Sequence, residues 1–192
     1  MRLSLFRNLL VFNFLFINFF LLQAQSSAKK KIDTLEIVDI RLNFGKAGVK
    51  SRRNPDVIVL HATYFQRSDD PYSLLGCLRQ FAAYNVSAHY IILRTGLVVR
   101  LVDEDDVASH AGVSQLPDGT TNAAVNDRSI GIEMIYRDTE SPSEAQIQSL
   151  KLLIANIRSR RKINTLTGHS DIAPLRRSDP WHFDWSRIGG RF

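Results

Sequence analysis

The stretch VIVLHAT, residues 57–63, is the first part of the chain after its N-terminal segment with a clear pattern of apolar residues. Four apolar residues, Val57 to Leu60, stand directly before a histidine, and three of the four are β-branched. A short apolar run of this kind predicts a buried strand that ends at His61. A second run, residues 129–136, has the same character but contains Glu133. A carboxylate inside an apolar strand is costly unless it has a partner or a chemical task, although a place on the solvated face of an edge strand is also open.

Two segments with helical spacing lie between and after these strands. Pro71 is expected to open a helix that runs to about Tyr84, with apolar residues at helical intervals. A second helix is predicted to reach about Arg160, because Ser141 is followed by Pro142 and, three residues after the serine, by Glu144. A capping serine, a proline in the first turn and an acidic third residue are typical of a helix start.

The remaining pattern completes a fold class. Residues 89–93 and 97–101 are expected to form two strands around a turn at Thr95-Gly96, and the tail from Gly168 looks loop-like. Strands that alternate with helices indicate an α/β fold, a single domain with a central mixed β-sheet flanked by helices. The predicted domain covers residues 55–192.

Charge and cysteine content narrow the possible partners and sites. The chain of 192 residues carries 25 Lys and Arg against 19 Asp and Glu, a formal net charge of +6. This is a mildly basic balance, which suits an anionic polymer and is too weak to indicate nucleic acid binding. Cys77 is the only cysteine, so no intramolecular disulfide forms and any metal must be held by histidine and carboxylate.

The first residues predict export. Residues 9–22 are almost wholly apolar after a start that contains Arg2 and Arg7, and small residues follow at 26–28. The apolar stretch is short for a membrane span and fits a signal peptide over residues 1–28, with an uncleaved anchor as the alternative. Residues 29–54 are expected to be an N-terminal leader with one short strand at most. The folded part is expected to be periplasmic or secreted.

Three residues stand out as a candidate metal site. His61 ends a predicted strand, His169 lies in the loop-like tail, and Asp179 follows ten residues later. Two histidines and one carboxylate are the three protein ligands of many catalytic zinc sites, where the fourth position holds water. Scattered residues of these types are more often unrelated, so spacing alone leaves both interpretations open.

The local contexts of these residues resemble a known family. Five blocks occur in the order seen in the zinc N-acetylmuramoyl-L-alanine amidases, which include bacterial amidases of wall recycling, phage T7 lysozyme and the peptidoglycan recognition proteins. The blocks are VIVLHAT (57–63), VSAHYII (86–92), SHAG (109–112), NDRSIGIE (126–133) and GHSDIAPLRRSDP (168–180). The resemblance covers roughly residues 55–188 and implies the fold of that family.

The resemblance also implies roles for single residues. His61, His169 and Asp179 would bind one zinc ion per chain, and Glu133 would be the catalytic carboxylate. Arg177 stands where the family usually has a lysine that stabilises an oxyanion; arginine keeps the charge but differs in shape. Three further residues would line the substrate cleft, namely His110, Asn126 and Arg128. For His110 a role in loop packing is an equal alternative, and Arg128 is equally a candidate surface charge.

The function implied is hydrolysis of the amide bond between N-acetylmuramic acid and L-alanine in peptidoglycan or muropeptides. A monomer is expected, with no nucleic acid partner and no membrane contact unless the signal stays uncleaved. One alternative is a non-catalytic peptidoglycan-binding module of the same fold. Another is a zinc peptidase that cuts elsewhere in the stem peptide.

Overall fold

Six strands form one mixed sheet in the order β1-β5-β4-β7-β3-β8. Their bounds are Ile37–Asp39 (β1), Val98–Arg100 (β5), Tyr90–Ile92 (β4), Ser129–Ile135 (β7), Val57–Thr63 (β3) and Thr165–Gly168 (β8). Strand β3 lies between two parallel partners, β7 and the edge strand β8, whereas β4 and β5 form the predicted antiparallel hairpin. The computed structural model describes residues 35–49, 53–66 and 68–192, so the predicted signal peptide lies outside the described residues.

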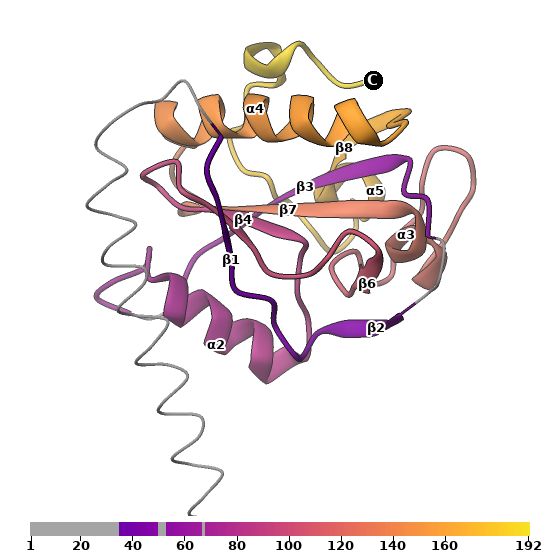
Figure 1. Cartoon of the computed structure of the whole chain (residues 1–192). Helices are drawn as coiled ribbons and strands as arrows, with labels where there is room; N and C mark the ends of the chain where they lie inside the picture. Colours follow the sequence, from indigo (N-terminus) through magenta and orange to yellow (C-terminus); the bar gives the residue numbers. More distant parts are fainter. Residues whose placement is uncertain (1–34, 50–52, 67) are drawn as a thin grey trace, which may run out of the picture.

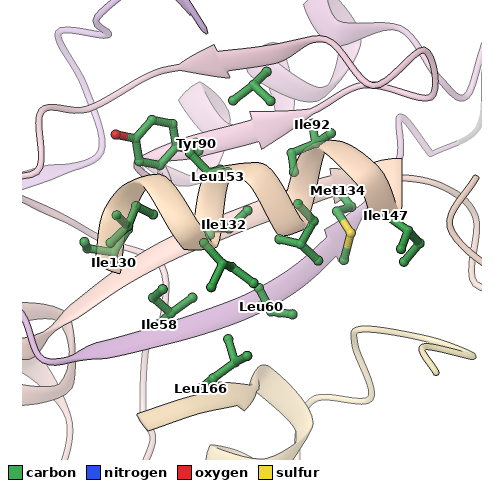
Figure 2. Close-up of a cluster of buried hydrophobic side chains, with 14 of the residues drawn as sticks. Ile58, Leu60, Tyr90, Ile92, Ile130, Ile132, Met134, Ile147, Leu153 and Leu166 are labelled. Atoms are coloured by element: carbon green, nitrogen blue, oxygen red, sulfur yellow. The ribbon is translucent and has the colours of Figure 1, made fainter. Parts of the chain in front are cut away.

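Helices cover both faces of this sheet, which confirms the predicted fold class. Figure 1 shows α4 (Glu144–Arg160) on one side and α2 (Leu74–Tyr84) on the other. Because side chains alternate along a strand, Ile58 and Leu60 of β3 point toward α4, where they join a large apolar cluster (Figure 2). Val59 belongs to a different cluster on the opposite face. His61 shares the face of Val59, so the strand that builds the core also presents its histidine on the side away from α4.

The start of α4 differs from the prediction. The capping residue is Ser143 and not Ser141: the Ser143 hydroxyl accepts a hydrogen bond from the backbone N–H of Gln146, and the Gln146 side chain accepts one from the Ser143 N–H. Gln146 is fully buried, and its side-chain amide also donates to the carbonyl ends of strands β4 and β7. The hydrogen bonds of Gln146 to these distant strands therefore determine that Ser143, and not Ser141, caps α4.

The start of α2 also lies further along the chain than predicted. Ser73 is the cap, accepting a bond from the N–H of Gly76, and the helix begins at Leu74 rather than at Pro71. The carbonyl of Pro71 instead accepts a hydrogen bond from the N–H of Phe65, which holds the segment before α2 against the end of β3. Among the described residues, no helix is long and apolar enough to cross a membrane.

The leader contains more structure than predicted. The expectation of one short strand at most is wrong, because β1 joins the edge of the main sheet beside β5, and β2 (Lys46–Val49) pairs with β6 (Asp106–Ala108). The tail after Gly168 is also not only loop, since it holds a short helix and a 3-10 turn. The remaining elements are α3 (Ala123–Arg128), α5 (His169–Ile172) and η1 (Trp185–Ile188).

Candidate metal centre and active site

Two neighbouring strands bring the candidate ligands together. His61 lies near the carboxyl end of β3, and His169 is the first residue of α5, directly after β8. Because β3 and β8 are parallel neighbours, with Leu60 opposite Gly168, the residues that follow them emerge at the same edge of the sheet. Asp179 is tied to this edge through its backbone carbonyl, which accepts a bond from the N–H of Ser170 at 2.7 Å.

The three side chains converge on one point. Nδ1 of His61 lies 2.9 Å from Nδ1 of His169, and Oδ2 of Asp179 lies 3.2 Å from the His169 nitrogen and 3.5 Å from the His61 nitrogen. All three residues are buried. Ligand atoms about 2.0–2.1 Å from a tetrahedral zinc lie about 3.3 Å apart, so this donor set fits such an ion. The structure therefore contains a buried cluster able to bind a metal.

The electrostatics of the cluster favour the forms that bind a metal. Burial, and next the nearby His169, lower the pKa of His61 to about 4, so its ring is neutral at physiological pH. Burial acts to raise the pKa of Asp179, but its polar contacts with His169 and His61 outweigh burial and hold that pKa well below its usual value. A neutral imidazole and an ionised carboxylate are the species that coordinate cations.

Nε2 of His61 and of His169, the outer ring nitrogens that face away from the proposed metal position, also have partners. Nε2 of His61 lies 3.0 Å from Nδ1 of His110, and Nε2 of His169 lies 3.1 Å from the carbonyl oxygen of Ala111. Partners of this kind orient metal-binding histidines. Both come from the same loop, which contains the SHAG block.

Glu133 lies next to the cluster. In the parallel pairing of β3 with β7 its register partner is His61, so the two side chains are neighbours on one face of the sheet. Its Oε2 is buried and has no hydrogen-bond partner among the described residues. Burial, and then the negative charge of Asp179, raise the pKa of Glu133 well above its usual value, while Arg177 acts in the opposite direction. A carboxyl with a raised pKa beside a metal site is suited to transfer protons.

Arg177 lies close enough to influence these groups. Its side chain is exposed, and its backbone N–H donates to the carbonyl of Ala173, one turn beyond α5. Its positive charge lowers the pKa of both Glu133 and His61. The structure thus brings Arg177 near the predicted ligands, and its role toward an oxyanion stays a prediction.

The three residues predicted to bind substrate are engaged with the protein itself. The carboxamide oxygen of Asn126 accepts from the backbone N–H of His110 and of Ala111, at 3.1 and 2.9 Å. Arg128 forms ion pairs with Asp56 and Asp118. These contacts bring His110 and Asn126 to the ligand cluster and leave Arg128 in a separate ionic network; contact with substrate stays a prediction for all three.

Sequence reasoning missed Ser129 and Gly131 of β7. The Ser129 hydroxyl lies 3.1 Å from Nε2 of His110, and a Cβ built on Gly131 would lie 2.6 Å from Cγ of the His110 ring. The signal was present in the alternation of residues 129–133, which places Ser129, Gly131 and Glu133 on the face of His61. It was hidden because the run looks like an ordinary apolar strand start.

Comparison with known proteins agrees with this geometry. Residues 51–182 match the family described as N-acetylmuramoyl-L-alanine amidase. The chain is 43% identical over 112 residues to the 1,6-anhydro-N-acetylmuramyl-L-alanine amidase AmpD of Escherichia coli, a match that covers 57% of this chain and 60% of that protein. It therefore spans about three fifths of the length of such curated relatives.

Solved structures share the fold. The crystal structure of an AmpD derivative superposes with a TM-score of 0.68 at 30% identity, over 83% of this chain and 96% of the other. AmpDH3 from Pseudomonas aeruginosa, in complex with anhydromuramic pentapeptide, superposes with a TM-score of 0.58 at 28% identity, over 77% and 63%. The family match spans more than half of the chain and includes all three candidate metal ligands. The chain therefore belongs to the N-acetylmuramoyl-L-alanine amidase family.

Proposed function

We propose that this protein is a zinc-dependent amidase that hydrolyses the amide bond between N-acetylmuramic acid and L-alanine in peptidoglycan or muropeptides. The observation that carries the proposal is the convergence of His61, His169 and Asp179 on one point beside Glu133, whose buried Oε2 has no hydrogen-bond partner within the described part of the chain. Three ligands leave one position of a tetrahedral zinc open, as in catalytic rather than structural sites.

The ligands would hold one zinc ion through the two Nδ1 atoms and Asp179 Oδ2. Zinc bound there supplies a Lewis acid that polarises the scissile carbonyl and lowers the pKa of a water molecule. The protein contributes the fixed geometry of the donor atoms and a buried setting in which electrostatic interactions are strong.

Glu133 is assigned the proton transfers. Its carboxylate takes a proton from the attacking water as the new carbon–oxygen bond forms, and passes that proton to the L-alanine nitrogen as the carbon–nitrogen bond breaks. The raised pKa of Glu133 suits both steps, because it makes the carboxylate a stronger base toward water than an ordinary glutamate. Glu133 would be ionised at the start of the cycle when zinc is bound, because a metal ion beside the carboxyl would favour its charged form.

Arg177 is assigned the charge that develops on the carbonyl oxygen. The side chain is exposed and forms no ion pair within the described residues, and its charge acts on Glu133 and His61. An arginine is always protonated and presents several N–H donors, so it can replace the lysine usual in the family at this place.

The substrate class follows from the relatives. AmpD is named as an amidase of 1,6-anhydro-N-acetylmuramyl-L-alanine, and AmpDH3 was crystallised with anhydromuramic pentapeptide. Each of these two compounds joins a muramic residue to an amino acid or a peptide, which supports a muropeptide as the substrate of this chain. A monomer is proposed to be sufficient, because all assigned groups come from one chain.

Export is part of the proposal. A signal peptide over residues 1–28 would deliver the catalytic domain, residues 55–192, to the periplasm or the medium, where peptidoglycan lies. Cell fractionation together with the mass of the mature protein tests this: a mass that lacks about the first 28 residues supports cleavage, and a full-length protein in the membrane fraction supports the anchor instead.

The activity is tested with defined muropeptides and mass spectrometry. Release of a stem peptide with a free L-alanine amino terminus, lost with chelator and in Glu133→Gln, is the expected result. Cleavage at another bond would point to a peptidase. Muropeptide binding by the zinc-loaded protein without cleavage would point to the non-catalytic binding module, and absence of bound zinc under metal-replete conditions would refute the metal centre.

A further inference from the structure

A line of hydrogen bonds runs from the metal cluster into the sheet. Nε2 of His61 lies 3.0 Å from Nδ1 of His110, and Nε2 of His110 lies 3.1 Å from the Ser129 hydroxyl. The line ends at the carbonyl oxygen of Val125, 2.5 Å from the same hydroxyl. Every polar ring atom of His61 and His110 is therefore engaged: Nδ1 of His61 in the ligand cluster and the other three along this line.

The end of the line determines the direction of every hydrogen bond in it. A carbonyl oxygen can only accept, so the Ser129 hydroxyl donates its single proton to Val125. The hydroxyl can then only accept from His110, whose Nε2 must carry the ring proton. In a neutral ring Nδ1 of His110 is an acceptor, and it takes the proton of Nε2 of His61. Nδ1 of His61 is left unprotonated, with its lone pair toward His169 and Asp179.

The neutral state of His110 is supported by its surroundings. The ring has no carboxylate partner among the described residues, and its contacts on the sheet side are the ring of His89, at a centroid distance of 5.8 Å, and Gly131. Nothing near it favours a second ring proton.

We infer that the dipeptide His110-Ala111 is a positioning element that orients both histidine ligands of the proposed zinc site. The His110 side chain fixes the tautomer and ring plane of His61, and the Ala111 carbonyl accepts the outer N–H of His169. This inference rests on the proposed function, since it assigns what holds the ligands. It gives His110 and Asn126 a task different from the substrate contact expected of them.

Two contacts hold the dipeptide in place. The Asn126 carboxamide oxygen accepts from the backbone N–H of both residues, and Arg176 donates to the Ala111 carbonyl at 2.5 Å. Gly131 leaves room for the His110 ring, because a Cβ there would lie 2.6 Å from ring carbon Cγ. A side chain at residue 131 would therefore collide with the His110 ring.

The test measures zinc affinity, not cleavage. Purified His110→Leu and Ser129→Ala are compared with the unchanged protein by competition against a chromophoric chelator. Loss of an outer partner of a metal-binding histidine typically weakens metal affinity about 10- to 100-fold, and this range is expected for His110→Leu. His110→Asn, whose side-chain oxygen can accept in place of Nδ1, is expected to recover part of the affinity.

Ser87→Ala is the matched control. Ser87 is also buried, and its hydroxyl donates to a backbone carbonyl, that of Ala88, outside the line described above. Ser87→Ala is expected to lose about as much stability as Ser129→Ala, without any change in zinc affinity. Zinc affinity of His110→Leu within twofold of the unchanged protein would overturn the inference.

A second measurement needs no variant. Long-range ¹H–¹⁵N spectra of the zinc-free protein report which ring nitrogen carries the proton, and Nε2–H is expected for both His61 and His110. A proton on Nδ1 of either ring would overturn the inference even if zinc binds. If the unchanged protein binds no zinc but shows these tautomers, the proposed metal centre fails while the positioning of the rings stands.

Discussion

Replacing Glu133 with glutamine tests the feature on which the proposed proton transfers depend. The substitution removes an ionisable group and keeps its size. In the folded protein one Glu133 oxygen is buried without a partner among the described residues. Burial first, and the charge of Asp179 second, raise the pKa of Glu133 well above its usual value of 4.5. The unfolded chain has neither influence, so the two states bind protons differently.

The size of the effect follows from proton linkage. Between pH 4.5 and the raised pKa, the folded protein keeps a proton on Glu133 that the unfolded chain releases, so the free energy of unfolding falls as pH rises. The slope is about 1.4 kcal/mol per pH unit for one proton. As pH rises from 5 to 6, the stability of Glu133→Gln should therefore increase relative to that of the unchanged protein, by at most about 1.4 kcal/mol, against a total stability of about 5–15 kcal/mol.

His61 acts in the opposite direction but does not obscure the result. Its lowered pKa, about 4, means that stability is lost as pH falls from 6.5 toward 4. This contribution is present in both proteins and cancels in the difference between them. The difference in free energy of unfolding thus isolates Glu133.

The assay is urea unfolding at a series of pH values in the presence of chelator. Glu36→Gln, which removes an exposed carboxylate next to β1, controls for the loss of one negative charge. A difference for Glu133→Gln that stays level with pH, or one of opposite sign, would refute the raised pKa and with it the assignment of Glu133 as a group that both takes and returns a proton.

Three further outcomes are expected. Arg177→Lys should keep most of the kcat on a muropeptide. Arg177→Ala should lower kcat about 100-fold, which is the smaller end of the range for loss of an oxyanion donor. A kcat of Arg177→Ala equal to that of the unchanged protein would exclude the proposed role. Gln146→Leu should lower the free energy of unfolding by about 3 kcal/mol, because two buried carbonyls lose their donor, against about 1 kcal/mol for the cap variant Ser143→Ala; urea titration separates the two. Free zinc at 100 times its Kd should stabilise the unchanged protein by about 2.7 kcal/mol, and a similar rise in Tm for Asp179→Ala would contradict its place among the ligands.

The regularly patterned parts of the fold could be predicted from the sequence. The pattern of apolar residues predicts the buried strand β3, the strand β7 and the apolar face of α4. Ile58, Ile132 and Leu150 are examples: each belongs to a run of apolar residues that recur with the period of a strand or a helix. These elements depend on side chains close together in the chain, so a local pattern is enough. The motif blocks, through their family resemblance, also marked the three ligands that the structure brings together.

Which of several local alternatives the chain adopts depends on contacts between residues that are distant in the sequence. Ser143 rather than Ser141 caps α4, because Gln146 reaches carbonyls of two distant strands. The edge strand β1 forms because its residues pair with the parallel strand β5. The hydrogen-bond roles of His110 were equally hidden, since they depend on Ser129 and on the carbonyl of Val125 beside it. Contacts between residues far apart in the chain leave no periodic trace in the sequence, and they decide where each polar group finds its partner.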